Sequence, residues 1–227
     1  MENDWKKELM ERLELLYLSA KRNNRMFPEH DLSHAIRVRN LCLYINKKDA
    51  LGLDKDILIA AAMLHDLGYI SDDSPKHAKS SIQFANTLLP SVKFPRNKSI
   101  SVIACIKNHD FVPGRKGWTK KVPMECHILR DADAIESLGC LGMIRYASWG
   151  GRNQMPFIVQ YKKSDDKSNA FPQIDLIKNI KIRSAELIMR CYTKTGMRIM
   201  QERLKIMQKF ILEIEKELNF AKNLGGK

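Results

Sequence analysis

The sequence has 227 residues, of which 44% are hydrophobic and 29% are charged. A chain of this length can bury a substantial core as one domain, and its composition excludes intrinsic disorder and collagen-like sequence. The formal net charge of +13 favours anionic ligands such as nucleotides, nucleic acid or an acidic membrane surface. The basic residues are scattered, however, so we expect most of them on solvated helix faces.

The N-terminal stretch MENDWKKELMERLELL lacks the apolar segment of a signal peptide, and no run of about 18 apolar residues occurs in the chain. We therefore expect a cytoplasmic protein with no membrane partner. The five cysteines form no CxxC pair and lie within helical patterns, which favours free, buried thiols over disulfides or zinc ligands. They are Cys42, Cys105, Cys126, Cys140 and Cys191.

Helical periodicity dominates the sequence, and strand-like alternation is almost absent. The sequence therefore predicts a single all-α domain, a bundle of roughly eight helices. Residues 1–24 form the first predicted helix, whose apolar stripe can cover either the core or a second subunit. That stripe consists of Trp5, Leu9, Leu13 and Leu16. Residues 25–147 form the predicted helical core, in which Asp31 and Asp54 are expected to cap helix N-termini and Gly68 a C-terminus.

The longest interruption of the helical pattern is residues 148–173, which contain paired glycines and two prolines. A loop of this length in a compact domain is typical of a lid or binding loop, with a plain surface loop as the alternative. We predict a flexible loop near the site. Residues 174–223 are expected to form two long amphipathic helices that pack back on the core.

His65 and Asp66 interrupt the apolar run AAAMLHDLGYI at the end of a predicted helix. An imidazole beside a carboxylate suits a divalent transition ion or magnesium, and the negative end of the helix dipole favours a cation there. Two further ligands are available. His34 lies in the first turn of one predicted helix, and Asp131 opens the segment DADAIESLG at the start of another. Taken singly, each of these residues is explained as well by helix capping.

The order His34, His65–Asp66, Asp131 resembles the HD-domain superfamily of metal-dependent phosphohydrolases. HDLSHAIRVRNLCLYI is similar to its first ligand helix, and AAAMLHDLGYI to its signature helix. LRDADAIESLGCLGMIR and YTKTGMRIMQERLKIMQKFILEIEKEL are similar to small single-domain bacterial HD nucleotide (pyro)phosphohydrolases. The resemblance covers about residues 25–218. It implies a single HD domain in which these four side chains bind one divalent ion, drawn from manganese, magnesium, nickel, cobalt, iron and zinc.

The chain departs from the superfamily pattern at two positions. Ala134 stands where a basic residue is common, and the acidic residue expected around Ser137 is Glu136. The missing basic residue removes a substrate contact that the resemblance would otherwise imply. The four expected metal ligands are unaffected.

His77 and His109 lie in the region where two-metal members of the superfamily carry additional ligands. They can hold a second ion bridged by Asp66, or they can act beside a single ion, holding a phosphate or protonating the leaving oxygen. One ion is favoured, because the most similar stretches belong to members described with one. Asp66 is expected to hold the ion and to orient the attacking water.

A positive clamp is expected to neutralise the remaining phosphate charge. The candidates are Arg37, one turn beyond His34, and Arg145, with Lys76 and Arg152 as weaker ones. Three other residues are expected to have supporting roles only. His30 and His127 are assigned to packing or caps, and Asp133 to a cap or to support of the ligands.

The predicted activity is hydrolysis of a phosphate ester or phosphoanhydride of a nucleotide by attack of metal-bound hydroxide, with nucleoside triphosphate pyrophosphohydrolysis as one form. Two alternatives stay open. One is a phosphodiesterase for cyclic nucleotides or single-stranded nucleic acid, for which Phe111, Trp118 and Trp149 are the candidate stacking residues. The other is a non-catalytic nucleotide sensor. The sequence does not fix the base, the sugar or the oligomeric state, and a homo-oligomer is left open.

Overall fold

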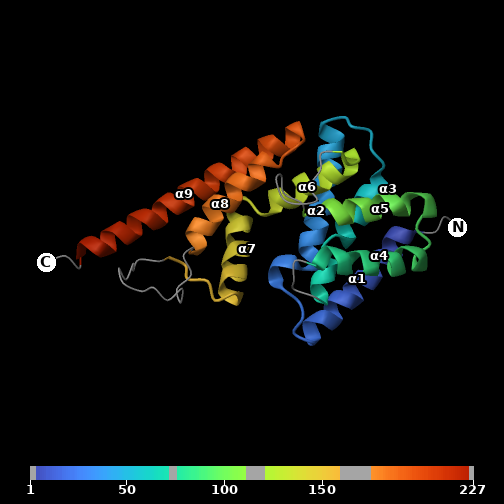
Figure 1. The fold of residues 1–227 in the computed structure, drawn as a ribbon, viewed down its shortest axis with the longest axis horizontal. Helices are drawn as coiled ribbons and strands as arrows, with labels where there is room; N and C mark the ends of the chain where they lie inside the picture. Colours follow the sequence, from blue (N-terminus) through green and yellow to red (C-terminus); the bar gives the residue numbers. More distant parts are fainter. Residues whose placement is uncertain (1–3, 72–75, 111–120, 159–174, 225–227) are drawn as a thin grey trace.

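Figure 1 shows a computed structural model of the protein, which describes residues 4–71, 76–110, 121–158 and 175–224. This part of the chain contains nine α-helices, two short 3₁₀ helices and no strand, which confirms the predicted all-α class. In chain order the elements are α1 (Trp5–Arg22), η1 (Pro28–His30), α2 (Leu32–Lys48), α3 (Lys55–Leu64), η2 (Leu67–Ile70), α4 (His77–Ser91), α5 (Arg96–Asn108), α6 (Met124–Glu136), α7 (Gly139–Arg152), α8 (Leu176–Met189) and α9 (Lys194–Leu224).

The first six helices form one body, in which α2, α3, α5 and α6 pack against one another (Figure 1). The N-terminal helix α1 contributes its apolar stripe to this core. Trp5, Leu9 and Leu13 are buried there, and the Trp5 ring meets the Phe94 ring edge-on at 4.7 Å. The stripe of α1 therefore covers the core of its own chain.

Aspartate caps fix the starts of the two helices that carry the central histidines. The Asp31 carboxylate accepts a hydrogen bond from the His34 backbone N–H at 2.8 Å, and Asp54 accepts from Asp56 and Ile57, so both predicted caps are confirmed. Gly68 does not cap α3. That helix ends at Leu64, and Gly68 lies inside η2.

A close contact with α4 explains why a glycine stands at position 68. A side chain at position 68 would place its Cβ 2.0 Å from the backbone oxygen of His77, the first residue of α4. The Gly68 backbone N–H also donates to Ser81 Oγ in α4 at 2.8 Å. Absence of a side chain therefore lets the start of α4 lie directly against η2.

The last three helices pack together on one side of the first six and extend away from them toward the C-terminus (Figure 1). α8 and α9 confirm the two predicted C-terminal helices. The prediction of a loop from residue 148 is wrong for residues 148–152, because α7 continues to Arg152. Gly150 is buried in this helix, where a Cβ would lie 2.9 Å from Leu176, so its small size serves close packing of α7 on α8. Residues 153–158 belong to no helix, in agreement with the predicted loop, and residues 159–173 lie outside the described residues.

All five cysteines are free. Cys42, Cys105 and Cys126 are buried as predicted, whereas Cys140 is exposed and Cys191 is half-buried, so burial was wrongly predicted for these two. Within the described ranges no helix combines the length and the apolar character needed to cross a membrane.

Candidate metal centre and active site

Four side chains from two helices and the end of a third converge at the centre of the molecule. They are His34 from the first turn of α2, His65 and Asp66 from the end of α3, and Asp133 from α6. His34 Nε2 lies 3.4 Å from Asp66 Oδ2 and 3.4 Å from Asp133 Oδ1. His65 Nε2 lies 3.4 Å and 3.8 Å from the same two oxygens. We call these four residues the metal cluster.

The donor atoms of the metal cluster fit a divalent ion. His34 Nε2 and His65 Nε2 are buried and have no hydrogen-bond partner in the described part of the chain. An unsatisfied buried nitrogen is costly, and coordination would satisfy both. Bonds of about 2.0–2.3 Å to one ion separate neighbouring ligand atoms by roughly 3–3.7 Å, the range of most of these distances. Two imidazoles and two carboxylates suit a transition ion such as manganese, iron or zinc.

Second partners orient the two imidazoles toward the cluster. His65 Nδ1 lies 2.8 Å from the Ala62 carbonyl, which can only accept, so Nδ1 carries the proton and Nε2 presents its lone pair. His34 Nδ1 faces Glu136 Oε2 at 3.7 Å. Glu136 in turn accepts a hydrogen bond from Arg37 Nε at 2.6 Å. Arg37, predicted as a phosphate ligand, therefore supports the Glu136–His34 pair and is not among the described residues lining the cavity.

The side chains of the metal cluster shift one another's pKa values strongly. Burial opposes ionisation of Asp66, yet His65 and His30 hold its pKa well below the usual range. Burial likewise opposes ionisation of Asp133, but the neighbouring His34 and His65 imidazoles keep the pKa of this carboxyl well below its usual range. Burial also disfavours the charged form of His65, but without an ion the two carboxylates raise its pKa to about 10, so an ion at the cluster would displace the Nε2 proton. Both carboxylates are therefore ionised and available as ligands.

The structure corrects the sequence-based choice of the last aspartate. Asp131 and Asp133 both lie in the second half of α6 and not at the start of a helix. Because they are two positions apart, their side chains leave the helix about 200° apart, so only one can face the cluster. The Asp131 carboxylate instead accepts hydrogen bonds from the backbone N–H groups of Tyr192 and Thr193 and from the Thr193 hydroxyl. It anchors the turn between α8 and α9.

A second histidine group meets the other oxygen of Asp66. His109 Nε2 lies 3.3 Å and His77 Nε2 3.6 Å from Asp66 Oδ1, and the two ring nitrogens are 3.1 Å apart. His109 Nδ1 lies 2.7 Å from the Ile106 carbonyl, so in the neutral ring its Nε2 is an acceptor and His77 Nε2 is the donor between the rings. Oδ2 of Asp66 therefore lies in the metal cluster, and its Oδ1 faces this histidine pair.

His30 and Tyr69 belong to the site, although the sequence did not single out either as functional. His30 Nδ1 lies 2.7 Å from Asp66 Oδ2, and its ring stacks on Tyr69 with centroids 3.9 Å apart. The other face of Tyr69 stacks on His77 at 4.2 Å with an interplanar angle of 11°. The position of His30, four residues before His34, was the available signal. His127 is stacked on Tyr192 at 3.9 Å, which confirms its packing role.

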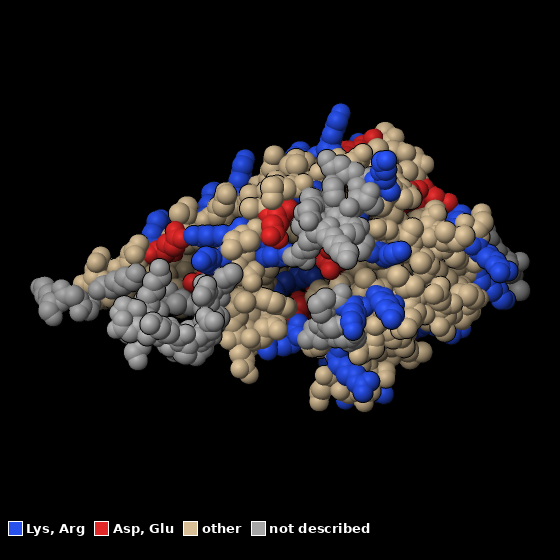
Figure 2. Space-filling view, in the orientation of Figure 1, with Lys and Arg blue, Asp and Glu red and all other residues tan. Residues whose placement is uncertain are grey.

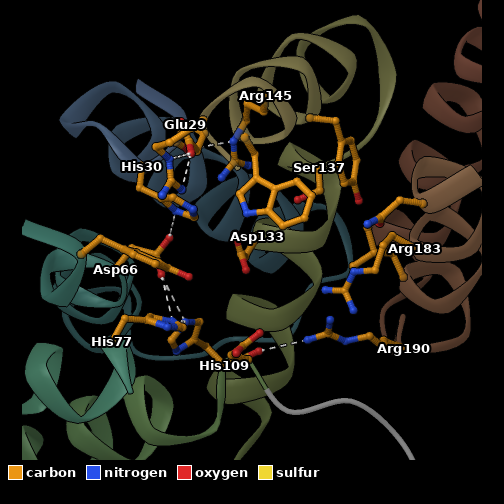
Figure 3. A pocket seen from close by; sticks show the side chains of 17 residues that line it. Glu29, His30, Asp66, His77, His109, Asp133, Ser137, Arg145, Arg183 and Arg190 are labelled. Carbon is orange, nitrogen blue, oxygen red and sulfur yellow. Dashed lines mark hydrogen bonds and ion pairs between the residues drawn. The ribbon is translucent and has the colours of Figure 1, made fainter. Parts of the chain in front are cut away.

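The metal cluster and the histidine pair open into a cavity of about 500 Å³ (Figure 3). One side of it carries His30, Asp66, His77, His109 and Asp133. The side formed by α7 and α8 carries Trp149 and four arginines, Arg145, Arg152, Arg183 and Arg190. In the view of Figure 2, basic side chains are spread over the visible face and do not gather into one stripe.

The predicted substrate residues have different positions. Arg145 lies in the cavity wall, where its Nε donates to the Glu29 carbonyl at 2.9 Å. Arg152 also lines the cavity but pairs with the buried Glu29 carboxylate at 2.7 Å. Lys76 is exposed at the start of α4 and is not among the described lining residues. Phe111 and Trp118 lie outside the described residues.

Comparisons with known proteins agree with this architecture. A solved structure from Lactobacillus plantarum has a TM-score of 0.68 at 19% identity and covers 91% of this chain and 96% of that chain. An HD-superfamily hydrolase from Bacillus thuringiensis has a TM-score of 0.59 at 19% identity, with 93% and 98% covered. Bacillus subtilis YpgQ in complex with ADP has a TM-score of 0.64 at 20% identity, with 90% and 97% covered.

A curated relative and a family model give the sequence-level evidence. The uncharacterized protein L803 of Acanthamoeba polyphaga mimivirus is 27% identical over 151 residues. The match covers 57% of this chain and 57% of that protein, so the chain spans little more than half the length of this relative. Residues 31–138, which include the whole metal cluster, match the HD domain model. Residues 31–138 therefore match the HD domain, and the solved structures share the fold of the chain as a whole.

Proposed function

We propose that the protein hydrolyses a phosphate ester or phosphoanhydride of a nucleotide. The observation that carries this proposal is the metal cluster facing an arginine-lined cavity. A divalent ion, when bound, acidifies water and polarises a phosphoryl oxygen. The guanidinium groups suit the negative charge of a phosphate, which they bind with two parallel hydrogen bonds.

The cavity favours a small nucleotide over a nucleic acid strand. Its volume of about 500 Å³ is that of a site that encloses a small molecule. Trp149 offers an aromatic surface in the same wall as Arg145, which suits a nucleobase next to its phosphates. The described basic side chains on the face in Figure 2 are spread out and not aligned, which favours an enclosed small molecule over a strand.

The residues around the reacting phosphate have separate proposed tasks. Asp66 and Asp133 hold the ion through oxygens that are ionised at neutral pH. Asp66 also orients the attacking water, because its second oxygen faces the open side of the cluster at His77 and His109. His77, the donor of the histidine pair, is the candidate to protonate the leaving oxygen, and His109 accepts from it and keeps it in place.

We propose one ion per chain, bound by the metal cluster. The 3.1 Å contact between His77 and His109 is a hydrogen bond that uses the Nε2 proton of His77, and a second ion would have to displace that proton. Metal analysis of purified protein loaded with manganese is expected to give one ion per chain. Equal loading of His77→Ala would agree with this, whereas two ions per wild-type chain that fall to one in the variant would contradict it.

Phosphate release tests the activity itself. Metal-loaded protein is supplied with nucleoside monophosphates, nucleoside triphosphates and cyclic nucleotides, and orthophosphate and pyrophosphate are both measured. We expect at least one linear nucleotide to be cleaved, and Asp66→Asn to lower the rate by about 100-fold or more while the helical content is unchanged. Cleavage of cyclic nucleotides alone would favour the phosphodiesterase, and binding of nucleotide without turnover would favour the sensor.

A further inference from the structure

Two cysteine side chains meet inside the protein where α5 and α6 pack against each other (Figure 1). Cys105 lies in the last turn of α5 and Cys126 in the first turn of α6, and both are fully buried. Their Sγ atoms are 3.3 Å apart, which is within hydrogen-bond distance for two thiols. Both thiols are free. No step of the proposed hydrolysis uses either sulfur.

Both helices connect this pair of thiols to the active site. Cys105 is one helical turn before His109, which lies 3.3 Å from Asp66. Cys126 is two helical turns before Asp133 of the metal cluster. A change in the spacing of α5 and α6 at the two sulfurs is therefore transmitted to side chains that surround the proposed reaction.

The surroundings of Cys126 favour its thiolate, which is the form of cysteine that reacts with oxidants. Cys126 lies at the N-terminal end of α6, where the helix dipole favours negative charge. The hydrogen bond with Cys105 lowers the pKa of Cys126, burial opposes this, and the Arg130 guanidinium lowers the pKa further. The same hydrogen bond, together with burial, raises the pKa of Cys105. Cys126 is therefore the nucleophile of the pair, and Cys105 stays protonated.

The position of both cysteines at helix ends gives an oxidant access to them. Helix ends open locally more easily than helix interiors. Hydrogen peroxide is close to water in size, so a small opening is sufficient. Opening of the last turn of α5 or of the first turn of α6 exposes one of the two sulfurs.

We infer that Cys105 and Cys126 form an oxidation site, which hydrogen peroxide converts into a disulfide between α5 and α6. The Cys126 thiolate attacks one peroxide oxygen, the O–O bond breaks, and a sulfenic acid forms while the released hydroxide takes up a proton to become water. The Cys105 sulfur then loses its proton and attacks the Cys126 sulfur. The S–S bond forms, the S–O bond breaks and a second water leaves. Both sulfurs are oxidised, and both peroxide oxygens are reduced to water.

Formation of the bond changes the spacing of α5 and α6. A disulfide has an S–S length of about 2.05 Å, so the two sulfurs must approach each other by about 1.2 Å. Part of this movement falls on the helices that carry His109 and Asp133. A displacement of about 1 Å can slow a reaction by about 100-fold. We therefore expect the disulfide to lower turnover, and this consequence rests on the proposed function.

Peptide mapping tests the bond directly. The full chain is loaded with magnesium, which has no redox chemistry, and carries Cys140→Ser and Cys191→Ser to remove the two more accessible thiols. After treatment with hydrogen peroxide, we expect a nonreducing digest to contain a peptide linked through Cys105 and Cys126, which dithiothreitol separates. Recovery of both cysteines as free thiols would overturn the inference.

Single substitutions in the same background identify the reacting sulfur. In Cys105→Ala, dimedone is expected to trap Cys126 as a sulfenic acid, whereas in Cys126→Ala we expect Cys105 to stay unlabelled. The matched control is Cys42→Ala, because Cys42 is also buried but its Sγ lies 4.0 Å from the Ile128 carbonyl oxygen. Its digest is expected to contain the linked peptide. Labelling of Cys105 but not of Cys126 would overturn the assigned order of attack.

Turnover of the oxidised and the reduced protein is then measured with manganese. We expect oxidation to lower kcat roughly tenfold or more, dithiothreitol to restore it, and Cys126→Ala to be insensitive to peroxide. If the disulfide forms but kcat does not change, its link to the active site is overturned and the proposed function stands. If the disulfide forms but the reduced protein cleaves no nucleotide, the proposed function fails and the oxidation site stands.

Discussion

Asp131 and Asp133 lie two positions apart in α6, and only the Asp133 carboxylate belongs to the metal cluster. His34, His65 and Asp66 were predicted as a group and lie together, and His77 and His109 lie beside them. Asp131 and Asp133 could not be separated by pattern, because both cap-like and ligand-like readings fit DAD. The decision depends on how α6 is rotated between the metal cluster on one side and the α8–α9 turn on the other.

Exchange of each carboxylate for an amide separates these two roles. Asp133→Asn is expected to abolish tight metal binding while the protein stays folded. Asp131→Asn is expected to keep metal binding and to lower the free energy of unfolding by about 1–3 kcal/mol, because it weakens buried hydrogen bonds to Thr193 and Tyr192. Metal analysis and urea unfolding of both variants check this. Loss of the ion in Asp131→Asn alone would reverse the assignment.

Tyr69 is expected to position the two imidazoles that flank its ring. Its ring separates His30 from His77, which contact opposite oxygens of Asp66. Tyr69→Leu removes the flat spacer and is expected to lower kcat roughly tenfold with little change in KM. Tyr69→Phe keeps the ring and is expected to restore kcat. Equal rates for both variants and wild type would show that the stack does not position these imidazoles.

Among the elements, η1 and α7 are joined by one buried carboxylate. Glu29 accepts hydrogen bonds from Ser148 and Arg152 of α7, and the Arg152 guanidinium lies 3.9 Å above the centre of the Phe27 ring. Burial opposes ionisation of Glu29, but the bonds from Arg152 and Ser148 hold its pKa below the ordinary value of 4.5. This contact fixes η1, and with it His30, against α7, which carries two of the arginines that line the cavity.

The lowered pKa of Glu29 should make the free energy of unfolding depend on pH. A group whose pKa is lower in the folded state stabilises the fold above its unfolded pKa, and this contribution is lost as pH falls through the folded pKa. Glu29→Gln is expected to unfold about 1–3 kcal/mol more easily than wild type at pH 7. That difference should shrink below about pH 4. Chemical unfolding across this range checks it, and a difference that does not change with pH would contradict it.

The end of α7 illustrates why element boundaries were harder to predict than element type. Paired glycines in SWGG indicated a loop, since glycine has low intrinsic helix propensity. In the folded chain Gly150 lies against Leu176, and this tertiary contact outweighs the local preference. Amphipathic periodicity was sufficient for α1, α8 and α9, because in each of them one face packs on the rest of the protein. The cavity wall could not be predicted, because it depends on how α7 and α8 are placed against the HD domain.

The metal cluster joins α2, α3 and α6, so occupancy by an ion should affect the stability of the protein as a whole. An ion that binds only the folded state at about 100 times its dissociation constant adds about 2.7 kcal/mol. For a chain of this size we expect a chelator to lower Tm by roughly 5–10 °C. Calorimetry of wild type with and without the chelator measures this, and Asp133→Asn should show no such difference. An unchanged Tm for wild type would argue against a tightly bound ion.

The contact between Gly68 and His77 has a consequence for how this centre tolerates change. Only a hydrogen atom separates the η2 main chain from the first residue of α4. The contact between the main chains of η2 and α4 therefore sets the distance of His77 from Asp66. The packing of apolar side chains in the core does not set this distance. Substitutions in the interior can weaken the protein while leaving that distance unchanged, whereas any side chain at position 68 must push α4, and one imidazole with it, out of register with Asp66.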